Sequence, residues 1–197
     1  MDGPTRSHRY PPPNAAALGR GRPPAGEPPL PRPAVAHYLG VDPGVTGALA
    51  LLSIDGDGQH SVTVTPTPVL WLRIGSSRRR RYEIAPLLET LRALPPIALA
   101  CLEEQHARPG QGVTSTFATG YGAGLWTACL VACGISFVLA QPRRWRKLVG
   151  LPEAPDTKSR KLAVRLAACR RFPGLELKLE HADAVMLAVA ASLERTT

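Results

Sequence analysis

Residues 38–50 read YLGVDPGVTGALA, and this stretch decides how the rest of the chain is organised. An apolar run carries a single acid, Asp42, breaks at Pro43-Gly44 and then resumes. The pattern predicts a buried strand, a turn that glycine permits, and a second strand that returns beside the first. Burying an ionised carboxylate is costly unless a cation neutralises it. Asp42 therefore either caps the turn or is a metal-binding carboxylate at the tip of a central strand.

Length and charge narrow the class of protein. The 197 residues are enough for one domain with its own core. The formal net charge of +9 favours a polyanionic partner, most often nucleic acid, although it also fits a basic protein without such a partner. The four cysteines lie in apolar surroundings without a CxxC pair, which indicates buried thiols in a reducing compartment. No membrane span is expected, because no uncharged apolar run reaches about 18 residues.

Residues 1–36 differ in composition from the rest of the chain. Ten of the 21 prolines lie here, with scattered arginines and few acids. Such a segment buries too little apolar surface to offset its ordering entropy, so we expect a disordered leader or tail. Its bias toward Arg and Ala is compatible with an organelle transit peptide, and a plain disordered tail is the alternative. The folded domain is expected to span residues 37–197.

The pattern beyond this segment predicts an α/β domain that begins as a meander of hairpins. The expected strands cover residues 38–42, 47–54, 61–65, 97–102 and 135–139. The expected helices cover residues 82–94, 114–134, 156–171 and 180–191. A poorly ordered connector is expected over residues 66–75 and a basic loop over 141–147. The strand at 135–139 should run parallel to the one at 97–102, since a helix connects them.

A second acid follows a buried strand. The apolar run at 97–102 is followed by Glu103 and Glu104, so an acid again lies at the end of an expected buried strand, as Asp42 does. Two such strands side by side would place two acids within metal-bridging distance, whereas a surface-exposed strand end is the alternative. Glu103 is the preferred candidate over Glu104, because it follows the apolar run directly.

The closing helix supplies two more acids. Glu180 and Asp183 are spaced i,i+3, which would place both carboxylates on one helix face. Acids in a first turn are also favourable partners of the helix dipole. Because the rest of this helix is apolar and must be buried, Asp183 is expected to point into the protein beside the sheet. His181 could assist as a base, orient water or simply pack.

These acids form the candidate catalytic and metal-binding set: Asp42, Glu103, Glu180 and Asp183. Hard oxygen donors without thiolates suit Mg²⁺ or Mn²⁺ rather than zinc. Two such ions about 4 Å apart can activate water and stabilise the leaving oxygen of a phosphodiester. A basic surface around an acidic pocket is the combination that a nuclease needs.

Glycine is frequent in the expected helix at 114–134. Gly120, Gly122 and Gly124 each cost about 1 kcal/mol relative to Ala in a helix interior. Close approach of another backbone would explain them, either a symmetry-related helix or a DNA strand. Tight packing of this helix on the sheet is the alternative.

Basic and aromatic residues supply the candidate DNA-binding set. Four consecutive arginines at 78–81 are expected in a solvated loop and favour phosphate contact. Trp145 lies among basic residues, a pattern that suits a loop gripping a nucleic-acid backbone, although core packing is the commoner role of such a ring. The full set is Arg78, Arg79, Arg80, Arg81, Arg108, Gln111, Thr114, Phe117, Tyr121, Arg143, Arg144, Arg146, Lys147, Lys158, Arg160 and Lys161.

Three motifs occur in the order of a known family. They are Gly40-Val41-Asp42-Pro43-Gly44, Leu102-Glu103 and Glu180-His181-Ala182-Asp183-Ala184. In this set the chain resembles the RuvC family of Holliday junction resolvases, within the RNase H-like superfamily. Residues 120–134 and 142–147 resemble more narrowly its monokaryotic chloroplast branch in plants and algae. The resemblance implies a five-stranded mixed sheet flanked by helices, and a chloroplast location.

The resemblance also implies an activity. A homodimer would bind a four-way DNA junction and nick two opposed strands symmetrically with two Mg²⁺ ions per site. Asp42, Glu103 and Asp183 would be metal ligands with Glu180 as the fourth, although many family members have Asp at that last position. Residues 108–117 and the glycine-rich helix would face the junction centre. The alternatives are a ribonuclease H-like enzyme that cuts RNA–DNA hybrids and a junction-binding protein without catalysis.

Overall fold

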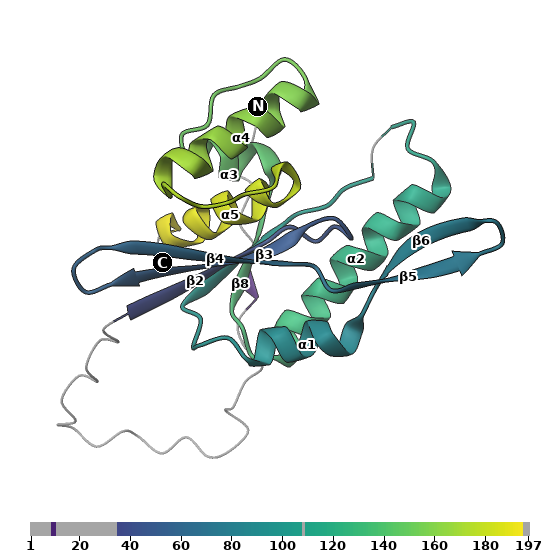
Figure 1. The fold of residues 1–197 in the computed structure, drawn as a ribbon, viewed down its shortest axis with the longest axis horizontal. Helices are drawn as coiled ribbons and strands as arrows, with labels where there is room; N and C mark the ends of the chain where they lie inside the picture. Colours follow the sequence, from purple (N-terminus) through teal and green to yellow (C-terminus); the bar gives the residue numbers. More distant parts are fainter. Residues whose placement is uncertain (1–8, 11–34, 108, 195–197) are drawn as a thin grey trace.

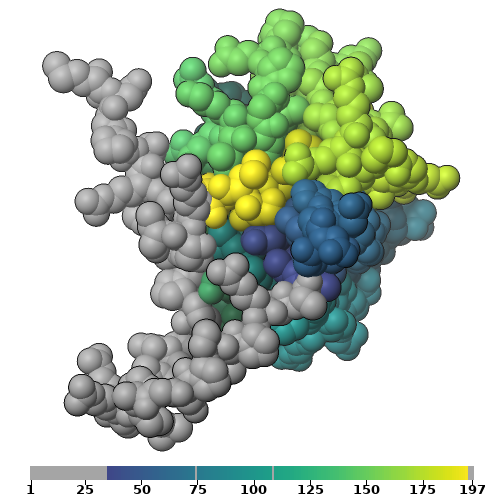
Figure 2. All heavy atoms as spheres, turned by 90° about the vertical axis from the view of Figure 1, so that its left-hand side faces the viewer, coloured from purple at the N-terminus to yellow at the C-terminus, as the bar shows by residue number. Residues whose placement is uncertain are grey.

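A computed structural model describes residues 9–10, 35–107 and 109–194. Its centre is a mixed β-sheet with helices on both faces (Figure 1). Helices α3, α4 and α5 lie on one face, and α1 and α2 lie on the other. The side view shows α5 between the sheet and the outer helices (Figure 2). Among the described helices, none is long and apolar enough to cross a membrane.

The central sheet contains β1 (Arg9–Tyr10), β2 (Val35–Val41), β3 (Ala48–Asp55), β4 (His60–Pro66), β7 (Leu99–Glu103) and β8 (Phe137–Ala140). Their order is β1-β8-β7-β2-β3-β4. Strands β2, β3 and β4 form the antiparallel meander, whereas β7 and β8 run parallel to β2. The five strands from β8 to β4 confirm the expected mixed sheet, and the two-residue β1 extends it at one edge.

The segment expected to be disordered, residues 1–36, lies mostly outside the described residues. Two parts of it are described: β1, which pairs with β8, and the first two residues of β2. Strand β2 thus begins at Val35, before the expected domain boundary. The prediction of disorder for residues 1–8 and 11–34 remains a prediction.

The helices are α1 (Ile84–Arg92), α2 (Val113–Ala132), α3 (Pro142–Leu148), α4 (Thr157–Arg171), the short 3₁₀ helix η2 (Leu179–His181) and α5 (Ala182–Leu193). Local chemistry accounts for several of their ends. The Asp156 carboxylate accepts hydrogen bonds from the amides of Lys158 and Ser159, which caps α4. Gly134 follows α2 with a φ of 68°, a conformation that favours glycine and ends the helix.

The core has two halves, one on each face of the sheet. On the first face, α5 is almost entirely buried between the strands and α4. It lies so close to β2 that a methyl group at Gly40 would collide with the carbonyl of Ala184 and the amide of Ala188. On the second face, Trp126 and Leu130 of α2 pack with residues of α1 and β8. This close packing of α5 on β2 fixes the position of Asp183, which α5 carries.

The segment expected to be a connector and a loop is instead a hairpin. Strands β5 (Val69–Ile74) and β6 (Ser77–Tyr82) form a two-stranded sheet of their own, separate from the central one. The arginines at 78–81 therefore lie in a strand. The prediction was wrong because the arginines at 78–81 show no apolar alternation, and because it gave too little weight to the apolar run at 69–74, which is itself consistent with a strand.

The basic loop expected at 141–147 is also wrong, since these residues form α3. Pro142 occupies the start of this helix, where its fixed φ is favourable and its missing N–H costs nothing. In α4 the buried residues are Val164 and Ala168, while the larger Leu162 and Leu166 are exposed. Small side chains allow α4 to approach the alanine-rich α5 closely.

Candidate active site

Three of the predicted acids come together at one end of the sheet. Asp42 follows β2, Glu103 ends β7, and Asp183 lies in the first turn of α5. Strands β2 and β7 are parallel neighbours with Val41 opposite Leu102, so the two acids leave the sheet side by side. Because α5 packs across both strands, its first turn reaches the same end. The topology thus brings together three segments that are far apart in the sequence.

The acids lie within each other's electric field. Burial, together with the negative charges of Glu103 and Asp183, raises the pKa of Asp42 to about 7. Burial and the charge of Asp183 also raise the pKa of Glu103. Burial raises the pKa of Asp183, while the positive charges of Arg146, Lys161 and Arg160 oppose this shift. The cluster is therefore a pocket of incompletely compensated negative charge.

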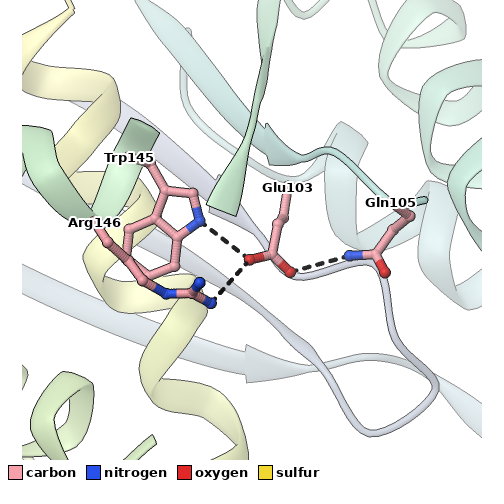
Figure 3. A network of polar contacts seen from close by, with 4 residues as sticks. All are labelled: Glu103, Gln105, Trp145 and Arg146. Carbon is pink, nitrogen blue, oxygen red and sulfur yellow. Dashed lines mark hydrogen bonds and ion pairs between the residues drawn. The ribbon is translucent and has the colours of Figure 1, made fainter. Parts of the chain in front are cut away.

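Glu103 is held by three neighbours (Figure 3). Its Oε1 accepts a hydrogen bond from Trp145 Nε1 at 3.1 Å and forms an ion pair with Arg146 Nη2 at 3.7 Å. Its Oε2 accepts a hydrogen bond from Gln105 Nε2 at 3.0 Å. The Arg146 guanidinium also lies 4.9 Å from the centre of the Trp145 ring. These contacts fix the carboxylate and counteract the rise in its pKa.

Sequence reasoning missed this network. Trp145 is buried, as the commoner interpretation expected, but its ring nitrogen is directed at Glu103. Arg146 was expected to contact DNA, yet its guanidinium is occupied by Glu103 and Trp145. More than 40 residues separate Glu103 from these partners, and no local pattern encodes a contact of that range.

The remaining acids lie apart from this cluster. Glu104 forms an ion pair with His106 at 3.4 Å, so Glu103 is the one that faces the other two acids. Glu180 is exposed on η2, and its carboxylate lies 4.0 Å from His181 Nε2. Buried His181 has a lowered pKa because of its burial, and Glu180 only partly opposes this shift. Its imidazole is therefore neutral at pH 7, and a ligand role of Glu180 remains a prediction.

The acid cluster has donor atoms that suit a divalent cation, but these atoms are not arranged as a complete ligand shell. In the part of the chain that the structure describes, no three His, Cys, Asp or Glu side chains are already arranged as a metal-binding group. Both Glu103 oxygens have protein donors, as described above. The donors of Asp42, Glu103 and Asp183 are nevertheless hard oxygens whose negative charge is only partly compensated, which suits Mg²⁺ or Mn²⁺.

The start of α2 carries the predicted aromatic contacts. Phe117 and Tyr121 are exposed, and their rings stack with centres 6.4 Å apart. Beside them is a polar hollow lined by Gln105, His106, Gln111, Ser115 and Thr119. Gln105 connects this hollow directly to Glu103. Predicted Thr114 is exposed on the same helix, and predicted Arg108 lies outside the described residues.

The predicted basic residues of α3 and α4 divide into three groups. Arg144 is paired with Glu194 at 2.9 Å, so it has a partner within the chain, as Arg146 does. Arg160 and Lys161 act electrostatically on Asp183, which places the start of α4 beside the acids. The others are exposed: Arg143, Lys147 and Lys158. Exposed Arg143 lies 3.8 Å from Glu153.

The turn after Asp42 is braced by the base of the hairpin. The Tyr82 hydroxyl donates a hydrogen bond to the Pro43 carbonyl at 2.7 Å. Gly122 of α2 allows this contact, because a methyl group there would collide with the Tyr82 hydroxyl and crowd the Pro43 carbonyl. Close packing within the chain, against Tyr82 and Pro43, thus accounts for Gly122, which is nearer to the alternative of tight packing. Approach of a symmetry-related helix or a DNA strand remains a prediction. Gly120 and Gly124 face open space within the described chain.

The raised pKa of Asp42 predicts an unusual pH dependence of stability without divalent cations. Between pH 3.8, the ordinary pKa, and about 7, the native chain keeps a proton that the unfolded chain has lost. The resulting stabilisation is complete below pH 3.8. It declines by at most about 1.4 kcal/mol per pH unit as pH rises from there, and it is lost once pH has risen through about 7. Urea denaturation in EDTA at several pH values should show this decline.

The control for this prediction is a pair of amide variants. Asp42→Asn should flatten the decline and be more stable than wild type at pH 8. Asp57→Asn, in an exposed turn, should follow wild type. Identical pH profiles for wild type and Asp42→Asn would contradict the assigned shift.

The fold and the three acids define a class of protein, an RNase H-like α/β domain with carboxylates at the ends of its central strands. The chain is similar to the solved structure of Thermus thermophilus RuvC in complex with a Holliday junction substrate, and to a further Thermus thermophilus RuvC structure. Each has a TM-score of 0.52 and 16% identity, over 80% of this chain and 93% of the RuvC chain. No family model and no curated protein matches the chain. The likeness confirms the expected RuvC-type fold.

Proposed function

We propose that this chain is a metal-dependent endonuclease that resolves four-way DNA junctions by paired hydrolysis on opposed strands. The observation that carries the proposal is the convergence of Asp42, Glu103 and Asp183 at one end of the sheet. The RuvC-type fold supports it, because one of the similar structures holds a Holliday junction substrate. The net charge of +9 favours a nucleic-acid partner.

Each acid of the cluster has a proposed role. Asp42, Glu103 and Asp183 would hold Mg²⁺, for which Mn²⁺ substitutes, with two ions per site and Glu180 as a further ligand. When bound, the ions supply the charge that activates water and stabilises the leaving oxygen. Trp145 and Gln105 orient the Glu103 carboxylate through their hydrogen bonds.

The surface around the acids has the groups that a DNA strand requires. Arg160 and Lys161 lie close enough to Asp183 to bind the phosphate next to the scissile bond. Phe117 and Tyr121 offer exposed aromatic faces on which an unstacked base at the branch point can lie. The polar hollow beside them has amide and hydroxyl groups for contact with a base edge.

We further propose a homodimer, since two symmetrical nicks require two copies of the site. We also propose that the protein acts in the chloroplast as a relative of the monokaryotic resolvases. The motif resemblance of residues 120–134 and 142–147 and the composition of residues 1–36 support this location. A reducing plastid stroma is compatible with thiols such as that of buried Cys101, whose pKa is raised to about 12 by burial.

A comparison of substrates tests the proposed function. In Mg²⁺ the chain should nick a mobile four-way junction at symmetrical positions on opposed strands, mapped to the nucleotide. A linear duplex with the same sequences should be cut far more slowly. Preference for an RNA–DNA hybrid would support the ribonuclease H-like alternative. Tight junction binding with no nicking in Mg²⁺ or Mn²⁺ would support a binding protein without catalysis.

A further inference from the structure

The β5–β6 hairpin is a strongly basic arm. It extends from the body of the protein beside α2, as a separate two-stranded sheet (Figure 1). Residues 69–82 contain five arginines and no Asp, Glu, Asn or Gln. None of these arginines forms an ion pair with a carboxylate of the described residues. Their charge is therefore available to an outside partner.

The strand register divides the hairpin into two faces. Trp71 is directly opposite Arg80, and Arg73 is opposite Arg78, so these four side chains share one face. On this face the Arg80 and Arg78 guanidinium carbons lie 4.9 and 5.5 Å from the centre of the Trp71 ring. We name it the Trp71 face.

The opposite face has the same charge without an aromatic ring. There Leu72 is opposite Arg79, and Leu70 is opposite Arg81. Arg79 and Arg81 have no ring contact among the described residues. The chain thus contains its own matched control, two pairs of arginines on one ribbon that differ in whether a tryptophan supports them.

An arginine that lies on an aromatic ring keeps its N–H groups available. The ring attracts the guanidinium and restricts its motion, so less entropy is lost when a phosphate binds. Trp71 is 52% exposed, whereas tryptophan is highly buried on average. Core packing therefore does not account for Trp71, and its contacts with Arg78 and Arg80 indicate that it supports these two side chains.

The hairpin is also fixed relative to the candidate active site. Tyr82 ends β6, and its hydroxyl binds the Pro43 carbonyl, one residue from Asp42. Its ring contacts Tyr121 of α2 with centres 6.0 Å apart. A DNA segment bound along the ribbon would thus be held at a defined distance from the acids.

We propose that the Trp71 face is a second DNA-contact surface, on which Arg78 and Arg80 bind the phosphate backbone of a duplex arm. The inference rests on the proposed function, which makes DNA the substrate. The ribbon lacks the amide and carboxylate side chains that read adenine and cytosine, and guanine is the one base edge that its guanidinium groups match. Because guanidinium groups also pair with phosphates of any sequence, we assign this surface to backbone contact. A second copy of the chain is disfavoured as the occupant, because two such ribbons would repel each other.

Tryptophan fluorescence tests the contact directly. Trp126 and Trp145 are 0% and 1% exposed, so acrylamide quenching reports mainly on Trp71. In EDTA, where no cleavage occurs, adding a four-way junction should protect this accessible emission from quenching. Trp71→Phe should remove the accessible component before DNA is added. Tight junction binding with unchanged quenching would overturn the proposal.

Salt dependence tests the role of the arginines. Arg78→Ala with Arg80→Ala should lower the slope of log affinity against log salt by about two, since each phosphate contact contributes about 0.9. Arg79→Ala with Arg81→Ala removes the same charge from the opposite face and should lower it less. Arg170→Ala with Arg171→Ala, at the far end of exposed α4, is a second control. Equal losses in all three double variants would overturn the assigned role of Trp71.

The outcomes separate the two proposals. A wild-type chain that neither binds nor cuts junctions refutes the proposed function. A chain that cuts junctions while its hairpin variants keep the wild-type quenching and salt slope refutes only the hairpin surface. Protection of Trp71 by an RNA duplex but not by junction DNA would assign the surface to RNA and overturn the proposal. All substituted residues are on the surface, so thermal unfolding of the variants should match wild type.

Discussion

Replacing Asp42 by Asn should abolish cleavage of a four-way junction while leaving junction binding intact. Asp42 is one of the three acids that meet at this end of the sheet, and the charges of both Glu103 and Asp183 act on it. Loss of residues that merely orient metal ligands costs about 10–100-fold, and loss of a ligand should exceed about 100-fold. Single-turnover cleavage in Mg²⁺ measures the rate, and fluorescence anisotropy in EDTA measures binding.

Two control variants sharpen this experiment. Asp57→Asn changes an exposed turn and should cut at the wild-type rate. Glu104→Gln, next to the cluster but paired with His106, should lose far less activity than Glu103→Gln. If Asp42→Asn cuts junctions at a rate close to wild type, the acid cluster is not the active site.

Replacing Gly40 by Ala should produce the largest loss of stability of any Gly→Ala change among the glycines that the structure describes. The new methyl would collide with the Ala184 carbonyl and the Ala188 amide, which are backbone groups of buried α5. Neither can yield unless the whole helix lifts from β2. The cost should exceed the roughly 1–3 kcal/mol typical of overpacking by a side chain. Urea denaturation at fixed pH measures it.

Other glycines of the chain provide the matched control. Gly120 and Gly124 lie in α2 with open space where a methyl group would be added. Gly120→Ala and Gly124→Ala should each stabilise the protein by up to about 1 kcal/mol through helix propensity. A Gly40→Ala variant as stable as wild type would show that α5 is not seated as described.

The acid-tipped strands were predictable because each has a local signature. Asp42 and Glu103 both follow apolar runs, and parallel neighbours in a sheet end at the same edge. Asp183 was placed correctly because the apolar sequence after it requires burial of α5. Glu180 differs, since the α-helix begins only at Ala182 and a 3₁₀ turn precedes it. That change of helix type alters the direction of a side chain two residues earlier.

Other features have no local signature. The arginine run of β6 has no apolar alternation, so only the apolar run of β5, with which it pairs, indicates the ribbon. Helix α3 has only two turns and one buried residue, Trp145, which is too little for a periodic signal. Two of the partners of Glu103, Trp145 and Arg146, come from α3 and meet it only through tertiary packing. Contacts of this kind depend on how the elements pack, which periodicity alone does not determine.

The assembly of the site from three distant segments determines when during folding the site becomes complete. Asp183 belongs to α5, which comes after every other described element and joins the sheet only by packing onto β2, β3 and β7. An incompletely folded molecule therefore lacks one of the three acids, even when its strands have formed. Under the proposed function, hydrolysis would therefore begin only in molecules that have finished folding, and nascent or partly denatured copies would leave DNA uncut.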